Sequence, residues 1–216
     1  GVRAAIDVLA SDDTWATDDT RQDRIEHCSE CPPELLRKLT DSGLVVVTHP
    51  GFIFENGRRY LSEVDAAMRP WLYRTGSLVD AGVTVAAGSD APVTDPDPFT
   101  GMYAAVTRRA RTGETIGVAE RVSAETALKM YTSSGAYAAF QQADLGSVEV
   151  GKLADLAVLD GDPTLIEPDD IRRTQVVMTV IGMMMVAGMS VVNCLKIFVL
   201  FFHFVSGLKM GVSTQS

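Results

Sequence analysis

Residues 83–92 read Val83-Thr84-Val85-Ala86-Ala87-Gly88-Ser89-Asp90-Ala91-Pro92. The first five form a short apolar run that contains β-branched residues and is followed by turn residues, a pattern that is typical of a buried strand. A carboxylate at the end of such a strand is costly unless something pairs with it. Asp90 is therefore the first candidate for a functional residue, and its partner has to come from elsewhere in the chain.

The rest of the sequence alternates between strand-like and helix-like segments. We expect the strands to end at His27 and to cover 44–48 and 83–87. We expect helices over about 2–9, 32–43, 71–81 and 99–111 and two short ones from Ser123 to 140, with loops over 11–20 and 50–62. Strict alternation of strands and helices indicates a parallel sheet or a barrel. Past residue 144, two short antiparallel strands joined by glycine turns are expected, over 146–152 and 155–160.

Histidines follow the other two predicted strands, His27 in Arg24-Ile25-Glu26-His27 and His49 after residues 44–48. In a β/α barrel, catalytic groups lie at the carboxyl ends of the strands. Imidazole suits zinc and similar divalent ions, and a carboxylate can bind the metal and also take a proton from water. These residues point to a metal-centred hydrolytic site. The alternative is that His27 and Asp90 are hydrogen-bonded loop residues.

Composition restricts the class of protein. The chain has 216 residues, 46% of them hydrophobic, and a net charge of −9, which favours a globular protein and argues against a nucleic-acid partner. The basic stretch Arg108-Arg109-Ala110-Arg111 is expected to be the solvated end of a helix rather than a phosphate site. Cys28-Ser29-Glu30-Cys31 has CxxC spacing without a second pair at zinc-finger distance, so incidental cysteines and a structural or redox pair both stay open. No secretory signal is visible, and we expect a cytoplasmic protein.

Several motifs, in order, resemble the amidohydrolase superfamily, and its amidohydrolase family 3 branch, which includes N-substituted formamide deformylases, most of all. The resemblance covers about residues 1–182 and rests on these segments: Arg24–His27, Gly88–Val93, Asp97-Pro98, Ala104–Arg108, Tyr131–Ser133 and Leu145–Asp160. It implies an α/β fold, namely the C-terminal part of a TIM-type (β/α)8 barrel (strands 6–8) over 1–143, followed by a partial β-sandwich over 144–190.

The resemblance also implies roles for the three candidates. His27 matches a metal ligand at the end of barrel strand 6, and Asp90 matches the general acid/base, often also a ligand, after strand 8. His49 lies where the family tends to place substrate-contacting residues, although a packing histidine is the alternative. The implied reaction is hydrolysis of carbon–nitrogen bonds other than peptide bonds, in small linear amides such as N-substituted formamides. It would use water activated by a divalent metal, most plausibly zinc. Glu26 is expected to form a structural ion pair near Arg24, and Trp71 and Tyr73 to pack on a helix.

Part of the family pattern is missing. The His-x-His pair of strand 1, the lysine or glutamate of strand 4 and the histidine of strand 5 have no counterpart in the sequence. We therefore expect a chain that lacks the N-terminal half of the barrel, binds metal weakly and is inactive alone.

The C-terminal part departs from the family too. From Val176 to Leu195 no residue is charged, and residues 191–216 form an apolar tail. The alternative from another class is therefore a non-catalytic remnant or interaction module that associates with a membrane through this tail.

Overall fold

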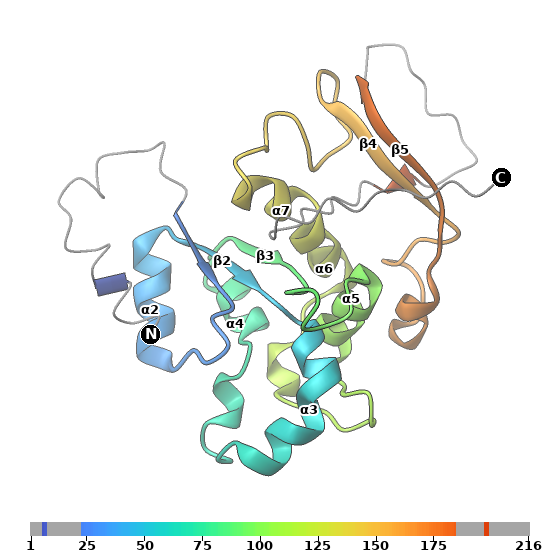
Figure 1. The fold of residues 1–216 in the computed structure, drawn as a ribbon. Coiled ribbons are helices and arrows are strands. Elements are labelled where there is room, and N and C mark those ends of the chain that lie inside the picture. The colour runs from blue at the N-terminus through green and yellow to red at the C-terminus, as the bar shows by residue number, and fades with distance from the viewer. Residues whose placement is uncertain (1–5, 8–22, 185–196, 199–216) are drawn as a thin grey trace.

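The computed structural model describes residues 6–7, 23–184 and 197–198 (Figure 1). Its first sheet has three parallel strands in the order β1 (Arg24–Glu26), β2 (Val45–Thr48) and β3 (Val85–Ala87). Ile25 pairs with Val46 and Val46 with Val85, so the strands are in register across the sheet. The three strands predicted from apolar runs and their parallel arrangement are confirmed.

Both faces of this sheet are covered by apolar side chains, which is why its strands lack the polar alternation of a solvated sheet. On one face, Ile25, Val46 and Val85 pack with α2 (Pro33–Ser42) and α4 (Thr75–Asp80). On the other face, Val45, Val47 and Ala86 pack against Ala138 of α7 (Ser133–Ala138). Helix α2 begins at a proline and ends at Gly43, which has φ +68°, as the sequence predicts.

The predicted loop over 50–62 is wrong, because this segment forms helix α3 (Gly51–Glu63). The sequence suggests a loop because it contains glycine, but Gly57 is there for close packing. A Cβ atom at Gly57 would lie 2.6 Å from both the Ala110 Cβ and the Ile116 Cδ1. The predicted helix 71–81 is shorter than expected. It consists of the 3₁₀ turn η2 (Arg69–Trp71) and α4, separated by Tyr73 in a left-handed conformation.

Helix α5 (Pro98–Thr107) is capped by Asp97, whose carboxylate accepts hydrogen bonds from the backbone N–H groups of Phe99 and Thr100. After the 3₁₀ turn η3 (Val118–Glu120), helix α6 (Ala124–Tyr131) is capped by the predicted Ser123. Helices α6 and α7 confirm the two short helices predicted to end near residue 140.

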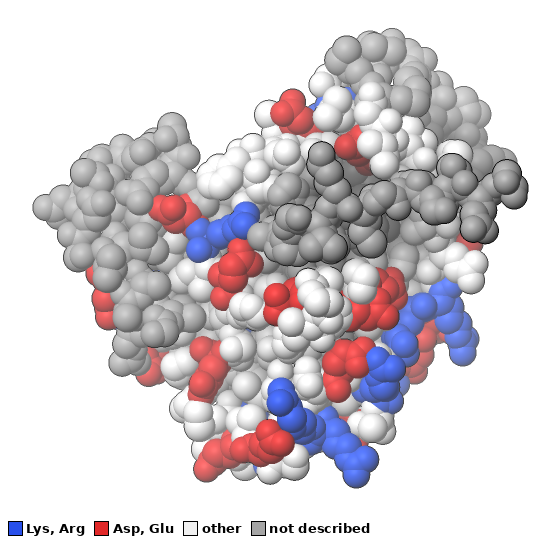
Figure 2. Space-filling model, in the orientation of Figure 1, with Lys and Arg blue, Asp and Glu red and all other residues white. Residues whose placement is uncertain are grey.

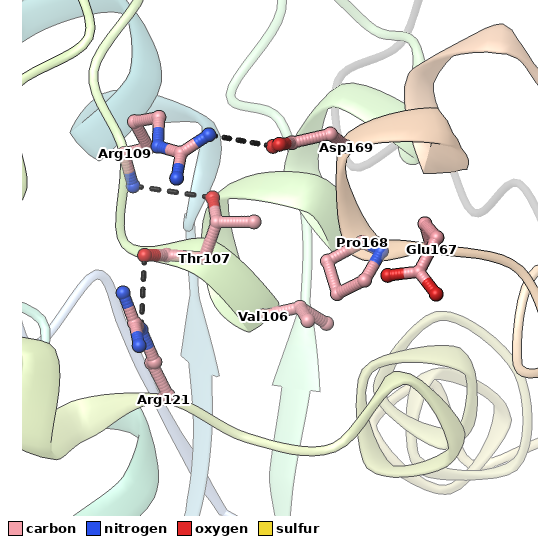
Figure 3. A pocket seen from close by; sticks show the side chains of 7 residues that line it. All are labelled: Val106, Thr107, Arg109, Arg121, Glu167, Pro168 and Asp169. Atoms are coloured by element: carbon pink, nitrogen blue, oxygen red, sulfur yellow. Dashed lines mark hydrogen bonds and ion pairs between the residues drawn. The ribbon is translucent and has the colours of Figure 1, made fainter.

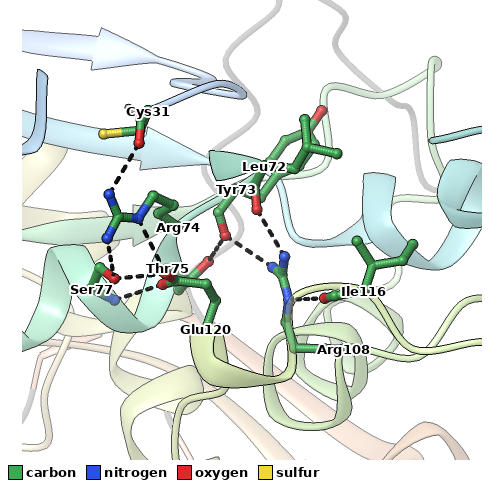
Figure 4. Close-up of polar contacts among 9 residues, drawn as sticks. All are labelled: Cys31, Leu72, Tyr73, Arg74, Thr75, Ser77, Arg108, Ile116 and Glu120. Carbon is green, nitrogen blue, oxygen red and sulfur yellow. Dashed lines mark hydrogen bonds and ion pairs between the residues drawn. The ribbon is translucent and has the colours of Figure 1, made fainter. Parts of the chain in front are cut away.

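The expectation for Arg108 is wrong. Helix α5 ends four residues earlier than predicted, and Arg108 adopts φ +56° with its side chain fully buried. Its guanidinium donates to three backbone carbonyls, those of Leu72 at 2.8 Å, Tyr73 at 2.9 Å and Ile116 at 2.9 Å (Figure 4). Burial lowers the pKa of Arg108 to about 10, which leaves the group charged at neutral pH. Arg108 thus ties the segment before α4 to the segment after α5.

The second sheet is antiparallel, with the order β5 (Val176–Met184), β4 (Leu153–Leu159) and β6 (Ile197–Phe198). The predicted strand over 155–160 is confirmed, but the one over 146–152 is wrong. Gly146 and Gly151 have φ values of +90° and +96°, so this segment turns instead. The 3₁₀ helix η4 (Pro168–Arg173) connects β4 to β5 and packs against α5.

Some predictions fall outside the described residues. Of the helix predicted over 2–9, only residues 6–7 are described, and the loop 11–20 is not. Of the apolar tail 191–216, only residues 197–198 are described. Within the described ranges, no helix has the length and apolar character needed to cross a membrane. The first residues of the uncharged segment, 176–184, form strand β5.

Gly101 in α5 provides a test of this packing. A Cβ atom there would lie 1.8 Å from the hydroxyl oxygen of Tyr131 and 2.8 Å from its Cζ. We expect Gly101→Ala to lower the free energy of unfolding by about 1–3 kcal/mol, because overpacking outweighs the better helix propensity of alanine. Urea unfolding measures this change. Gly135→Ala in α7 is the control, since its nearest neighbour, the Met130 carbonyl oxygen, lies at an ordinary 3.6 Å. Equal stability of the two variants would contradict the packing described.

Candidate active site

The three predicted site residues follow the three parallel strands in turn. His27 comes directly after β1, His49 directly after β2, and Asp90 in the loop after β3. The His27 Nε2 lies 3.7 Å from the Asp90 Oδ2, and the rings of His27 and His49 are 4.3 Å apart between centroids. The structure therefore brings all three together at the carboxyl edge of the sheet.

Backbone strain is concentrated at this edge. His27, Cys28, Tyr73 and Asp90 all have positive φ, between +46° and +67°, which non-glycine residues adopt only where the surroundings enforce it. The backbone N–H of His27 donates to the Val47 carbonyl at 2.8 Å, and the Asp90 carbonyl accepts from Val93 at 2.8 Å. Neighbouring backbone thus fixes the directions of the two side chains, as a functional site requires.

His49 is the most buried of the three, with 5% of its surface exposed. Burial, together with the neighbouring His27, lowers the pKa of His49 to about 4, so its imidazole is neutral at pH 7. Its Nδ1 is buried, and among the described residues it has no hydrogen-bond partner. Gly88 leaves room for this ring, since a Cβ atom there would lie 3.3 Å from the His49 Nε2. A buried nitrogen of this kind is uncommon in folded proteins and calls for an explanation.

Sequence reasoning missed the aromatic side chains beside the histidines. Phe52, in the first turn of α3, meets the rings of His27 and His49 edge-on at 5.9 and 6.1 Å. Phe52 also stacks on Tyr73 at 5.9 Å, and the Tyr73 hydroxyl lies 3.2 Å from that of Tyr60. The spacing of three residues between His49 and Phe52 predicts that the two side chains lie close together only if 51–63 is recognised as a helix. Tyr73 is a packing residue, as predicted, but does not lie on a helix.

The donor set fits a divalent metal in part. Two ligands of a tetrahedral zinc ion lie about 3.3 Å apart, since each bond is about 2.0–2.1 Å long. The 3.7 Å between the His27 and Asp90 atoms is close to this separation. Within the described residues, no group of three or more histidine, cysteine, aspartate or glutamate side chains has a geometry suited to a metal. The described part of the chain thus brings together two side chains of a type that can bind a metal, His27 and Asp90, with His49 beside them.

Glu26 does not join this group. Its carboxylate accepts a 2.7 Å hydrogen bond from the Arg24 Nε, which confirms the predicted structural ion pair.

A pocket of about 220 Å³ lies elsewhere, between α5 and η4 (Figure 3). Both arginines that line it have protein partners, since Arg109 donates to Asp169 at 2.6 Å and Arg121 to the Thr107 carbonyl at 3.1 Å. None of the three site residues lines this pocket. The three candidate site residues therefore lie away from this pocket, at the carboxyl edge of the parallel sheet.

On the face shown in Figure 2, acidic side chains are spread widely and basic ones gather toward the lower right.

The model of the amidohydrolase family matches residues 1–183. The chain belongs to the amidohydrolase family. An N-substituted formamide deformylase of Arthrobacter pascens is 33% identical over 159 residues, which cover 72% of this chain and 29% of the deformylase. The chain thus spans less than a third of the length of that relative.

Two solved structures are similar to this chain over part of their length. A metal-dependent hydrolase of Pyrococcus furiosus is 26% identical with a TM-score of 0.57, over 70% of this chain and 29% of its own. One of Pyrococcus horikoshii OT3 is 24% identical with a TM-score of 0.66, over 78% of this chain and 33% of its own. Both neighbours are described as metal-dependent hydrolases, and the likeness shows that this chain shares part of their fold.

Proposed function

We propose that this chain provides one side of a metal-dependent hydrolytic site that cleaves carbon–nitrogen bonds in small linear amides, with N-substituted formamides as the favoured substrates. The observation that carries the proposal is the meeting of His27 and Asp90 at 3.7 Å, on loops that hold both residues at positive φ. The likeness to a formamide deformylase supports the substrate class. In this proposal β1, β2 and β3 are strands 6, 7 and 8 of a barrel, and the second sheet is part of a β-sandwich.

In the proposed reaction, His27 and Asp90 would hold a divalent metal, with zinc as the favoured ion, and such an ion would supply a bound water with a pKa near 7. Asp90 accepts the proton of the attacking water and delivers it to the nitrogen that leaves, so that formate and an amine result. The neutral His49 offers its Nδ1, which has no hydrogen-bond partner among the described residues, to the substrate. Phe52 flanks both histidines and would shield the reacting carbonyl from bulk water.

Zinc titration of the purified chain tests the ligands. A catalytic zinc ion usually has three protein ligands, and the described residues supply two, so we expect one weakly bound zinc per chain and no hydrolysis by the chain alone. His27→Ala should lower the zinc affinity at least about tenfold, because loss of even an outer-shell partner costs this much. Asp95→Asn, a change in the same loop as Asp90, is the control and should leave the affinity unchanged. Tight zinc binding that survives His27→Ala would contradict the site.

Hydrolysis requires a more complete site. Residues 1–183 can replace the aligned segment of the Arthrobacter pascens deformylase, and release of formate from an N-substituted formamide then reports activity. We expect the chimera to be active. A folded, zinc-loaded chimera without activity would contradict the proposed function.

A further inference from the structure

The proposed function leaves two thiols unused beside the site. Cys28 directly follows His27, and Cys31 lies three residues further on. Both are free and buried, with 1% and 0% of their surface exposed, and both belong to the same buried hydrophobic cluster. The two residues between them, Ser29 and Glu30, are exposed. The CxxC spacing thus places the two thiols in one buried cluster beneath a short exposed turn.

The surroundings distinguish the two thiols. Arg74 donates from Nη1 to the Cys31 carbonyl at 3.3 Å (Figure 4). The same guanidinium donates to Glu120 at 3.2 Å and to the Ser77 hydroxyl at 2.9 Å, so its position beside Cys31 is fixed. Contact with Cys28 and the positive charge of Arg74 lower the pKa of the Cys31 thiol, although burial acts in the opposite direction. Cys31 is therefore the thiol of the pair that forms the thiolate more readily.

The backbone couples this pair to the site. Cys28 has φ +46° and His27 has φ +67°, so two consecutive residues are held in the left-handed region. The Cys28 N–H donates to the Glu26 carbonyl at 2.9 Å, and the Cys31 N–H donates to the Trp71 carbonyl at 2.9 Å. No residue separates Cys28 from His27. A bond that draws the sulfur of Cys28 toward Cys31 would therefore turn the backbone that aims the His27 ring.

We propose that Cys28 and Cys31 form a reversible disulfide on exposure to a small hydroperoxide, and that this bond weakens metal binding at His27. The first part stands on the geometry of the thiols alone. The second part rests on the proposed function, because it takes His27 as a metal ligand. The site would thereby be reversibly switched off under oxidising conditions.

One hydroperoxide molecule supplies the two-electron oxidation that forms the disulfide. The Cys31 sulfur attacks the outer peroxide oxygen, the O–O bond breaks, and the thiol proton leaves with the alcohol or water that is released. Cys31 is then a sulfenic acid. The Cys28 sulfur attacks the sulfenic sulfur, the S–O bond breaks, and water leaves with the Cys28 proton. Two thiols have lost two electrons in total, and the peroxide has gained them.

Hydrogen peroxide is the probe for the first part. The variant Cys194→Ser contains only the two thiols in question, since the sequence has three cysteines. After peroxide treatment and thiol labelling under denaturing conditions, we expect a monomer with the mass of two fewer hydrogens and no labelled thiol, and dithiothreitol should restore both labels. Unreacted thiols, oxygen addition without a disulfide, or bonds only between chains would each overturn the proposal.

Zinc affinity is the readout for the second part. We expect the oxidised Cys194→Ser chain to bind zinc about tenfold more weakly than the reduced chain, as for loss of an outer-shell partner, and dithiothreitol to reverse this. The control with Cys28→Ser and Cys31→Ser should bind zinc like the reduced chain and not respond to peroxide. If this control does not fold, Cys28→Ala alone replaces it.

The outcomes separate the two proposals. Equal zinc affinity of the oxidised and reduced chains would overturn the switch. A weaker zinc affinity of the variant with Cys28→Ser and Cys31→Ser would also overturn it, because the thiols would then be metal ligands. Absence of zinc binding in the reduced chain would overturn the proposed function together with the switch, while the mass measurement would still decide whether the disulfide forms.

Discussion

Asp90→Asn should lower the rate of amide hydrolysis about a thousandfold, the middle of the range for loss of a general acid/base. The asparagine keeps the size of the side chain but cannot accept the proton of the attacking water or deliver one to the leaving nitrogen. The measurement is kcat for formate release by the chimera that contains residues 1–183. Because a proton-transfer defect acts on the chemical step, we expect kcat to fall far more than KM changes.

Glu26→Gln is the matched control for Asp90→Asn. It makes the same change from carboxylate to amide next to His27, but Glu26 is committed to an exposed ion pair with Arg24. We expect kcat to stay within about twofold, since an exposed ion pair contributes little. Zinc content must be measured in both variants, because Asp90 is also a proposed ligand. A fall in kcat that zinc loss explains entirely would assign Asp90 to metal binding alone.

The strands, and the positions of the three candidate residues after them, were predictable because local sequence determines them. Short β-branched runs bounded by turn residues identified the strands, and a polar side chain at each carboxyl end identified His27, His49 and Asp90. These signals need no knowledge of distant residues. The parallel order of the strands then followed from the alternation of strands and helices.

The errors occurred where a distant partner decides the conformation. Gly57 suggests a loop in the sequence, but in the structure it allows helix α3 to pack closely against Ala110 and Ile116. Because residues 50–62 were predicted to form a loop, the position of Phe52 in a helix beside the histidines was not predicted. The roles of His27, His49 and Asp90 stay predictions, since the geometry brings the three side chains together but does not show what they bind.

Arg108→Met should strongly destabilise the fold. The substitution keeps much of the apolar stem but removes the five donors of the guanidinium. Three buried carbonyls, from Leu72, Tyr73 and Ile116, would lose their hydrogen bonds. Each such loss costs about 1–3 kcal/mol, so we expect the free energy of unfolding to fall by at least about 3 kcal/mol in urea unfolding.

Arg109→Met separates this effect from the loss of a positive charge. Arg109 is the next residue, and its guanidinium forms an ion pair with Asp169 at the surface. Water can replace that partner, so we expect almost no change in stability. Arg108→Lys adds a further distinction, because lysine keeps the charge but cannot reach three carbonyls with a planar fork. If Arg108→Lys were as stable as the parent chain, the charge rather than the three hydrogen bonds would hold the segment from Leu72 to Thr75 in place.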